Sequence, residues 1–333
     1  MDVMRLTRQL VDIDSTTGNE LVAGEFLLRE LSELGFRAEA MPVASSRFNV
    51  VARFADADPP QLFFSTHMDT VPPFISSSED EQNIRGRGSC DAKGIIAAQV
   101  AGALRLRSER IAVGLLFTVG EERDSIGALE ANRHSPRPRF MINGEPTENK
   151  LAVATKGALR IELTATGRMA HSAYPELGES AIEKLVRALA RLLEMKLPLD
   201  SEIGPSTLNI GVIEGGRAMN VISDFARAEL LYRTVQDSNE LKQQINAAIK
   251  GLCHAKVLLD TPAVHLRTLP GLPTMIASFT TDIPSLTNWG EPLLIGPGSI
   301  HVAHTEDEFI AKSDLLAAVD VYCDLAHRLL ATA

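Results

Sequence analysis

The sequence predicts an α/β protein in which one domain is inserted into another. Residues 1–157 alternate between helical and strand-like patterns, as a domain built around a largely parallel sheet does. Residues 158–265 follow a different order (strand, helix, strand, strand, helix, strand), which is the two-layer, ferredoxin-like arrangement. The first pattern then resumes toward residue 333. We therefore expect an outer domain of residues 1–157 and 266–333 around an inserted domain of residues 158–265.

The outer domain is expected to contain helices and strands in alternation. Short runs rich in apolar and β-branched residues predict the strands, and longer stretches of helical period predict the helices. The expected strands are Phe48 to Arg53, Gln61 to Thr66 and Ala112 to Val119, and the expected helices are an N-terminal amphipathic segment, Asn19 to Leu34, Lys93 to Arg107 and Ser313 to Leu330. Polar residues that follow such parallel strands gather at one edge of the sheet, where these folds bind ligands.

The inserted domain opens with a strand whose residues alternate. In Ala158 to Thr166, Leu159, Ile161 and Leu163 alternate with polar side chains, as in a half-buried antiparallel strand. The remaining expected elements are a helix over Ser180 to Met195, strands over Thr207 to Ile213 and Phe225 to Thr234, a helix over Asn239 to Leu252 and a strand over Lys256 to Leu259.

Composition narrows the class of protein. The 333 residues are 45% hydrophobic and 23% charged, which is typical of a globular chain, and the formal net charge of -10 argues against nucleic-acid binding. Cys90, Cys253 and Cys323 are too few and too scattered for a disulfide framework, so we expect a reducing compartment. No apolar run is long enough to cross a bilayer, and the N-terminal segment lacks a signal core. We expect a cytoplasmic protein without nucleic-acid or membrane partners.

The stretch FFSTHMDTVPPF places a histidine and an aspartate at the end of a predicted strand. Residues two apart on a strand share a face, so His67 and Asp69 can lie together. A carboxylate that accepts the imidazole N–H leaves the other ring nitrogen free to bind a metal or act as a base. A histidine satisfied by a local turn is an equally good explanation of this stretch alone.

Four further clusters stand at junctions of the outer domain. Asp91 lies in GRGSCDAKG, where it could simply cap the following helix. Glu121 and Glu122 are adjacent in TVGEERDSIGA, where a solvated turn is the alternative. Glu145 follows another apolar strand in INGEP. The loop GPGSIHVAHTEDE carries two histidines, His301 and His304.

Taken together, these clusters supply the ligands of a metal centre. Two imidazoles and three carboxylates suit a pair of borderline divalent ions with one carboxylate between them, and such polar side chains would be costly to bury without metal. The expected ligands are His67, Asp91, Glu122, Glu145 and His304. Glu121 then remains as an unbound carboxylate beside a ligand, which is what a general base requires.

Five motifs in order resemble those of a known enzyme family. HMDTVPP, GRGSCDAKGIIAA, TVGEERDSIGA, GEP and GPGSIHVAHTEDE are similar to motifs of the dizinc peptidase family that contains acetylornithine deacetylase, succinyl-diaminopimelate desuccinylase and carboxypeptidase G. The resemblance covers nearly the whole chain. It implies a zinc-peptidase-like α/β catalytic domain with a mixed sheet, and an inserted domain that acts as lid and dimerisation surface.

The resemblance also assigns the metal ligands. It implies that His67 and Glu145 bind one zinc, that Glu122 and His304 bind the other, and that Asp91 bridges the two. Cobalt or manganese are alternatives to the two zinc ions in each subunit. The family order Ala-His-x-x-Asp-Glu favours His304 over its rival His301 as the last ligand.

Further site residues follow from the same resemblance. Asp69 would orient His67, and Glu121 would take a proton from the bridging water and pass it to the leaving amine. The Asp91–Ala92 peptide is expected to be cis.

The resemblance extends to substrate binding. His171 and Asn220 of the inserted domain would hold the scissile carbonyl as its oxyanion develops, and Arg233 would grip a substrate carboxylate. A salt-bridged surface arginine remains the alternative for Arg233. Gly298 is expected to contact the substrate. The family also implies a homodimer through the inserted domain, in which His171 reaches the partner's active site.

These expectations define a function. The favoured hypothesis is a metal-dependent amidohydrolase that cleaves small N-acyl amino acids, with acetylornithine deacetylase-like activity first. Succinyl-diaminopimelate desuccinylation and release of lysine or ornithine from a carrier, all reactions of amino-acid biosynthesis, are close rivals. A metallo-carboxypeptidase or dipeptidase acting on peptides is the second class. A non-catalytic binding relative is the third, and the intact Glu121 and ligand set argue against it.

Overall fold

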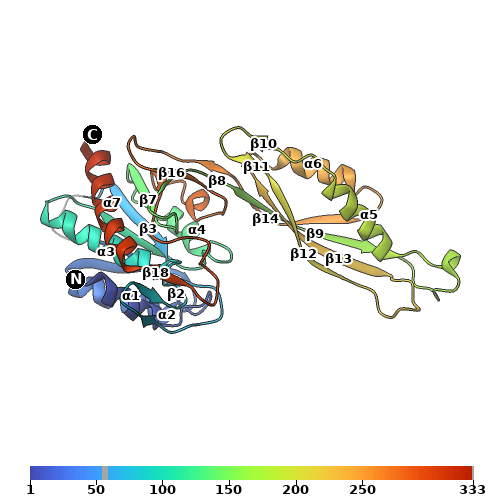
Figure 1. Cartoon of the computed structure of the whole chain (residues 1–333), viewed down its shortest axis with the longest axis horizontal. Coiled ribbons are helices and arrows are strands. Elements are labelled where there is room, and N and C mark those ends of the chain that lie inside the picture. Colours follow the sequence, from blue (N-terminus) through green and yellow to red (C-terminus); the bar gives the residue numbers. More distant parts are fainter. Residues whose placement is uncertain (55–58, 332–333) are drawn as a thin grey trace. The chain divides into compact units, whose positions relative to one another are not determined.

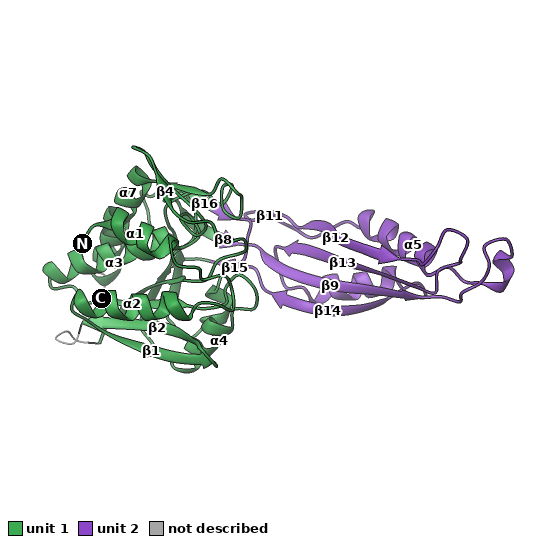
Figure 2. Cartoon of the chain, turned by 90° about the horizontal axis from the view of Figure 1, so that it is seen from below, with its two compact units in different colours: residues 1–153, 266–275, 281–333 green, residues 154–265, 276–280 purple. Residues whose placement is uncertain are grey.

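The computed structural model describes residues 1–54 and 59–331. The chain forms two compact units, coloured separately in Figure 2. Unit 1 consists of Met1–Val153, Leu266–Met275 and Thr281–Ala333, and unit 2 consists of Ala154–His265 and Ile276–Thr280.

Unit 1 is built on a six-stranded mixed sheet with the strand order β1-β2-β6-β3-β7-β17. The bounds are β1 Phe36–Ala44, β2 Arg47–Phe54, β6 Gly114–Thr118, β3 Leu62–His67, β7 Phe140–Asn143 and β17 Glu291–Leu294. The last four strands in this order run parallel to one another, whereas β2 is antiparallel to both β6 and β1. The mixed sheet therefore differs from a fully parallel one at its β1–β2 hairpin.

The central strands explain why the core forms here. Every residue of β3, β6 and β7 is buried, as expected for parallel strands covered on both faces. At Gly114 a Cβ would lie only 2.2 Å from the Phe63 ring, so glycine allows the close approach of β6 to β3. The helices of unit 1 are α1 Val3–Val11, α2 Leu21–Glu33, α3 Lys93–Ser108, α4 Ile126–Arg133 and α7 Lys312–Ala331. Helix α3 is buried along most of its length because it packs on the sheet and also contacts α1 and α7 (Figure 1).

Unit 2 contains a four-stranded antiparallel sheet with helices on one face (Figure 1). In the order β12-β13-β9-β14 the bounds are Thr207–Gly215, Phe225–Thr234, Gly157–Thr166 and His254–Thr261, and the helices are α5 Ala181–Leu193 and α6 Asn239–Ala248. Strand β13 alternates strictly, and its buried side chains pack with those of α5 and α6. The buried residues of β13 are Ala226, Ala228, Leu230, Tyr232 and Thr234.

The remaining elements are short. They are β4 Ser78–Glu79, β5 Asn83–Arg85, β8 Leu151–Thr155, β10 Leu199–Asp200, β11 Gly204–Pro205, β15 Val264–His265, β16 Thr274–Ala277, β18 Phe309–Ala311 and the 3-10 turns η1 Pro175–Leu177 and η2 Ile283–Ser285. Strand β18 pairs with β5, which brings the segment before α7 beside the segment before α3.

Several element ends differ from the sequence-based expectation. Ser180 lies outside α5 and caps it, because its hydroxyl accepts a hydrogen bond from the Glu183 backbone N–H at 3.2 Å. Helix α6 ends at Ala248 rather than at Leu252. Strand β1 was not anticipated, since its alternation is interrupted and it contains a proline near its end.

Candidate metal centre

Most of the predicted ligands follow four neighbouring parallel strands. His67 ends β3, Glu122 follows β6, and Glu145 follows β7. His304 lies in the loop that leaves β17, and Asp91 lies two residues before the start of α3. Because the carboxyl ends of parallel strands meet at one edge of the sheet, residues from four distant parts of the sequence converge there.

The carboxylate of Asp91 lies between two imidazoles. Its Oδ1 atom is 3.0 Å from His67 Nε2, and its Oδ2 atom is 3.4 Å from His304 Nε2. Each histidine also faces a glutamate: His67 Nε2 lies 4.0 Å from Glu145 Oε2, and His304 Nε2 lies 3.0 Å from Glu122 Oε1. The arrangement is thus two His–Glu pairs that share one aspartate.

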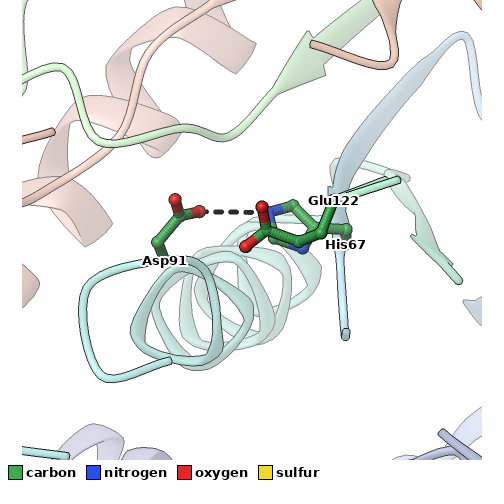
Figure 3. Close-up of side chains that lie close together, drawn as sticks. All are labelled: His67, Asp91 and Glu122. Carbon is green, nitrogen blue, oxygen red and sulfur yellow. Dashed lines mark hydrogen bonds and ion pairs between the residues drawn. The ribbon is translucent and has the colours of Figure 1, made fainter. Parts of the chain in front are cut away.

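Potential ligand atoms of three of these residues lie especially close together. Within the described part of the chain, atoms of His67, Asp91 and Glu122 all lie within 4.8 Å of one another. Figure 3 shows these three side chains converging from different elements, with the contact between Asp91 and His67 dashed.

Burial and mutual proximity dominate the electrostatics of this cluster. Burial, with the neighbouring charge of Glu145, raises the pKa of Glu121 well above its usual range, and burial does the same for the pKa of Glu145. Hydrogen bonds to Asp91 and Glu122 raise the pKa of His304 to about 10. Burial opposes a charge on Asp91, but hydrogen bonds from His304 and His67 still lower the pKa of its carboxyl group.

A divalent cation fits these residues. Glu145 Oε1 is buried and has no hydrogen-bond partner among the described residues. An unsatisfied carboxylate oxygen aligned with imidazole nitrogens and other carboxylates is costly unless a positive charge is bound. Imidazole together with carboxylate oxygen is a ligand set that suits zinc and other borderline divalent metals.

Asp69 has more partners than its predicted role required. His67 Nδ1 lies 2.9 Å from the backbone oxygen of Asp69, but 3.6 Å from the carboxylate. The carboxylate instead accepts hydrogen bonds from the backbone N–H groups of Glu121 at 3.1 Å and Glu122 at 3.3 Å, and from the Thr17 hydroxyl at 2.7 Å. Asp69 therefore holds the turn that carries the predicted base as well as lying beside the imidazole.

Glu121 is half-buried next to this turn, and no hydrogen bond or ion pair to another described residue occupies its carboxylate.

Asp282 is a buried acid that the sequence analysis did not identify. It accepts a hydrogen bond from the Thr118 hydroxyl at 2.7 Å, and burial raises its pKa to about 6. Asp282 stands in FTTDIPS, which has no motif character, so no local signal pointed to it.

Two of the remaining predicted residues lie together in unit 2. His171 pairs with Val221 in an isolated β-bridge, and the Ser172 N–H donates to the Asn220 carbonyl at 3.0 Å, so both predicted segments are adjacent. His171 Nδ1 accepts a hydrogen bond from the Ala173 backbone N–H at 3.1 Å. A neutral His171 therefore carries its proton on Nε2 and can donate from there.

Arg233 lies at the other end of strand β13. It is half-buried, burial lowers its pKa, and no ion pair or hydrogen bond joins it to another described residue. Strand β13 rises about 3.3 Å per residue, so roughly 26 Å separate Arg233 from Phe225, the end of β13 that follows Asn220.

Two further expectations concern backbone geometry. The Asp91–Ala92 peptide is cis. Gly298 has a φ of +78°, and a Cβ there would lie 2.5 Å from Cys90 Sγ, so this glycine lets the His304 loop pass over Cys90. That packing requirement is sufficient to explain Gly298 without a substrate contact.

Across the described residues, no helix combines the length and apolar character needed to cross a membrane.

Comparisons with known proteins agree with this architecture. The family model described as the peptidase dimerisation domain matches residues 153–256. A peptidase M20 domain-containing protein of Schizosaccharomyces pombe is 38% identical over 333 residues, which cover 96% of this chain and 83% of that protein. A probable carboxypeptidase of Aspergillus clavatus is 35% identical, over 97% of this chain and 88% of that protein.

The fold is shared with solved structures. A Bacillus subtilis protein described as a dinuclear metal-binding peptidase of the M20 family superposes with a TM-score of 0.74 at 17% identity, over 99% of this chain and 98% of that chain. The predicted fold class, an α/β domain with a mixed sheet and an inserted dimerisation domain, is thereby confirmed.

Proposed function

The chain belongs to the M20 peptidase family, and we propose that it is a metal-dependent hydrolase of amides whose leaving amine carries a carboxylate. The observation that carries this proposal is the position of Asp91, with one carboxylate oxygen facing each of two His–Glu pairs. Such an arrangement suits two cations held on either side of a shared carboxylate.

Carboxypeptidase-type cleavage is the leading substrate class. Relatives with about a third of their residues identical are described as probable carboxypeptidases, which favours a peptide with a free C-terminal carboxylate. Arg233 supports this choice, because a half-buried guanidinium without a partner among the described residues is suited to bind a carboxylate.

Deacylation of an N-acyl amino acid is the second candidate. Its scissile amide has the same surroundings as the last bond of a peptide, with an acyl carbon on one side and an α-carboxylate on the other. The ordered motifs that resemble acetylornithine deacetylase and succinyl-diaminopimelate desuccinylase favour it. A dipeptide is both a peptide with a free C-terminal carboxylate and an amino acid acylated on its nitrogen, so its cleavage would fit either candidate.

We assign two ions to the centre, zinc in the first instance and cobalt or manganese otherwise. His67 and Glu145 would hold one, Glu122 and His304 the other, and Asp91 both. Ions bound there would polarise the amide carbonyl and make water more acidic.

Glu121 is assigned the role of general base and acid. Its carboxylate is free of hydrogen bonds to other described residues, and burial raises its pKa well above the usual range of a glutamate, so the carboxylate is a stronger base than an exposed one. It would accept a proton from the attacking water and deliver that proton to the leaving amine. Its backbone N–H is fixed by Asp69, which keeps the carboxylate in one place.

Unit 2 is proposed to form a homodimer. Four exposed apolar residues recur on one stripe of α5, beside the unpaired edge strand β12. These residues are Ile182, Val186, Ala190 and Leu193.

His171 and Asn220 lie near the Phe225 end of β13, whereas Arg233 lies near its other end. One small substrate is too short to reach all three residues within a single unit 2. We therefore assign His171 and Asn220 to oxyanion binding in the partner's active site.

The domain roles follow from the same proposal. Residues 1–157 and 266–333 would carry out catalysis, and residues 158–265 would provide dimerisation and closure.

The three cysteines form no disulfide, and we therefore propose a reducing compartment such as the cytoplasm.

One experiment tests the function. Purified protein would be assayed for bound metal and for hydrolysis of matched substrates: dipeptides, the same dipeptides amidated at the C-terminus, and N-acetyl and N-succinyl amino acids. We expect divalent metal and cleavage only where the carboxylate is free. Cleavage of amidated and free dipeptides at equal rates would refute the carboxylate requirement. Absence of both metal and hydrolysis would favour a binding relative.

A further inference from the structure

Glu308 holds the segment that carries Asp91. Its Oε1 atom accepts hydrogen bonds from three backbone N–H groups: Gly88 at 2.9 Å, Cys90 at 3.1 Å and Asp91 at 3.1 Å. Its Oε2 atom accepts a hydrogen bond from Arg87 Nη1 at 2.7 Å. The side chains of Glu308 and Arg87 are 0% and 2% exposed, so these contacts are shielded from bulk solvent.

These contacts join two loops that both contribute to the metal centre. Glu308 stands only a few residues after His304, whereas the N–H groups that it binds belong to the loop of Asp91. The backbone pairing of β18 with β5, next to these contacts, keeps the two segments side by side. Convergence of three N–H donors on one oxygen fixes the path of the backbone up to Asp91, whose carboxylate faces both histidines.

We propose that Glu308 is a positioning residue of the metal centre: it sets the orientation of the Asp91 carboxylate relative to His304, and thereby the affinity for divalent metal. The simpler alternative is a buried ion pair that contributes only stability. The two differ in which oxygen matters, because the ion pair uses Oε2 and the backbone of Asp91 uses Oε1. The inference rests on the proposed metal-dependent function.

The informative substitution is Glu308→Met. Methionine has about the length of glutamate but offers no oxygen, so all three N–H groups lose their acceptor. Glutamine would be less informative, because its one oxygen could keep all three N–H contacts while its NH₂ group turns toward Arg87. For Glu308→Met we expect the affinity for Zn²⁺ to fall about 10- to 100-fold, the range typical of residues that orient metal ligands.

Arg87→Gln is the matched control. It removes the charged partner on Oε2 and leaves the three N–H contacts on Oε1. We expect a lower melting temperature with near wild-type affinity for Zn²⁺. If Arg87→Gln loses as much affinity for Zn²⁺ as Glu308→Met, the ion pair acts on the site through general stability, and the positioning role is refuted.

The measurement is calorimetric titration of chelator-treated, folded protein with Zn²⁺, together with its melting temperature. Wild-type affinity in Glu308→Met overturns the proposal. If that variant does not fold, Glu308→Asp takes its place; it keeps the charge but withdraws the oxygens by one methylene, so the same loss is expected and wild-type affinity again overturns the proposal. A wild-type protein that binds no divalent metal refutes the proposed function itself, which distinguishes the two failures.

Discussion

The carboxylate of Asp69 lies closer to the backbone of Glu121 than to the imidazole of His67. The Oδ1 atom is 3.1 Å from the Glu121 nitrogen and 3.6 Å from His67 Nδ1. The imidazole finds its nearest acceptor in the Asp69 backbone oxygen, at 2.9 Å. The side chain of Asp69 thus holds the turn of Glu121 and Glu122, and the backbone oxygen of Asp69 is the main partner of the His67 ring.

Asp69→Asn is expected to lower kcat more than it lowers metal affinity. An amide can accept on one oxygen only, so one of the two N–H groups of the Glu121–Glu122 turn loses its partner. Displacement of Glu121 should reduce kcat by about 10- to 100-fold, because general acid–base catalysis depends on the position of the proton carrier. His67 should remain bound to metal, since its backbone contact survives.

Thr17→Val is the control for that variant. It removes one hydrogen bond to the Asp69 carboxylate, at 2.7 Å, and leaves both N–H contacts of the turn. A smaller effect on kcat is expected than for Asp69→Asn. Equal losses of kcat in the two variants would contradict the idea that the N–H contacts of Glu121 and Glu122 to Asp69 position the base.

Glu121→Gln should retain metal and lose most turnover. The substitution preserves shape but removes the group that accepts and returns a proton. A loss of about two to four orders of magnitude in kcat is the usual scale for such a group. Metal content measured by mass spectrometry is expected to equal that of the wild type. Near wild-type turnover would show that another residue, such as Asp282, carries the proton.

The metal-free protein should become less stable as pH rises from about 6.5 to about 10. The pKa of folded His304 is raised to about 10 by Asp91 and Glu122, whereas an unfolded histidine titrates near 6.5. The folded state therefore holds more protons in this range, and its stability is lost as pH rises through the folded pKa. Raised pKa values of Glu121 and Glu145 act in the same direction.

Melting temperatures of chelator-treated protein at several pH values test this expectation. His304→Gln should flatten part of the decline, because it removes one of the two histidines of the cluster whose pKa is raised; the other is His67. Added Zn²⁺ should also flatten the decline, since a bound ion replaces the proton as the partner of the carboxylates. A melting temperature that rises across this range in the metal-free protein would contradict the assignment.

His171→Ala and Glu121→Gln are expected to complement each other. Each variant alone should be nearly inactive. A mixed dimer has one site with an intact Glu121 and a His171 from the other subunit, so random pairing should restore about a quarter of wild-type activity. Mass spectrometry of differently labelled subunits would establish that exchange occurred. Exchange without recovered activity would place His171 in its own subunit's reaction, or in none.

The sequence predicted the assembly of the site better than the contacts within it. The convergence of His67, Glu122 and Glu145 was predictable, because each follows a parallel strand and the ends of parallel strands meet at one edge of the sheet. The partners of Asp69 were not, since a strand pattern cannot tell a carboxylate contact from a backbone contact. The role of Glu308 was also hidden, because its partner Asp91 lies 217 residues away in sequence and no local pattern joins them.

Unit 2 is encoded between Glu145 and His304, and this order affects how the protein is made. The first four predicted ligands emerge from the ribosome before unit 2 does, whereas His304 and Glu308 emerge after it. The central sheet also lacks β17 until that point, although β7 has already been synthesised. Unit 2 can complete its local, antiparallel pairing while unit 1 is still unfinished. Unit 1 therefore cannot complete its sheet until the segment that contains β17 has been synthesised, and the β7 edge of the sheet stays unpaired until then.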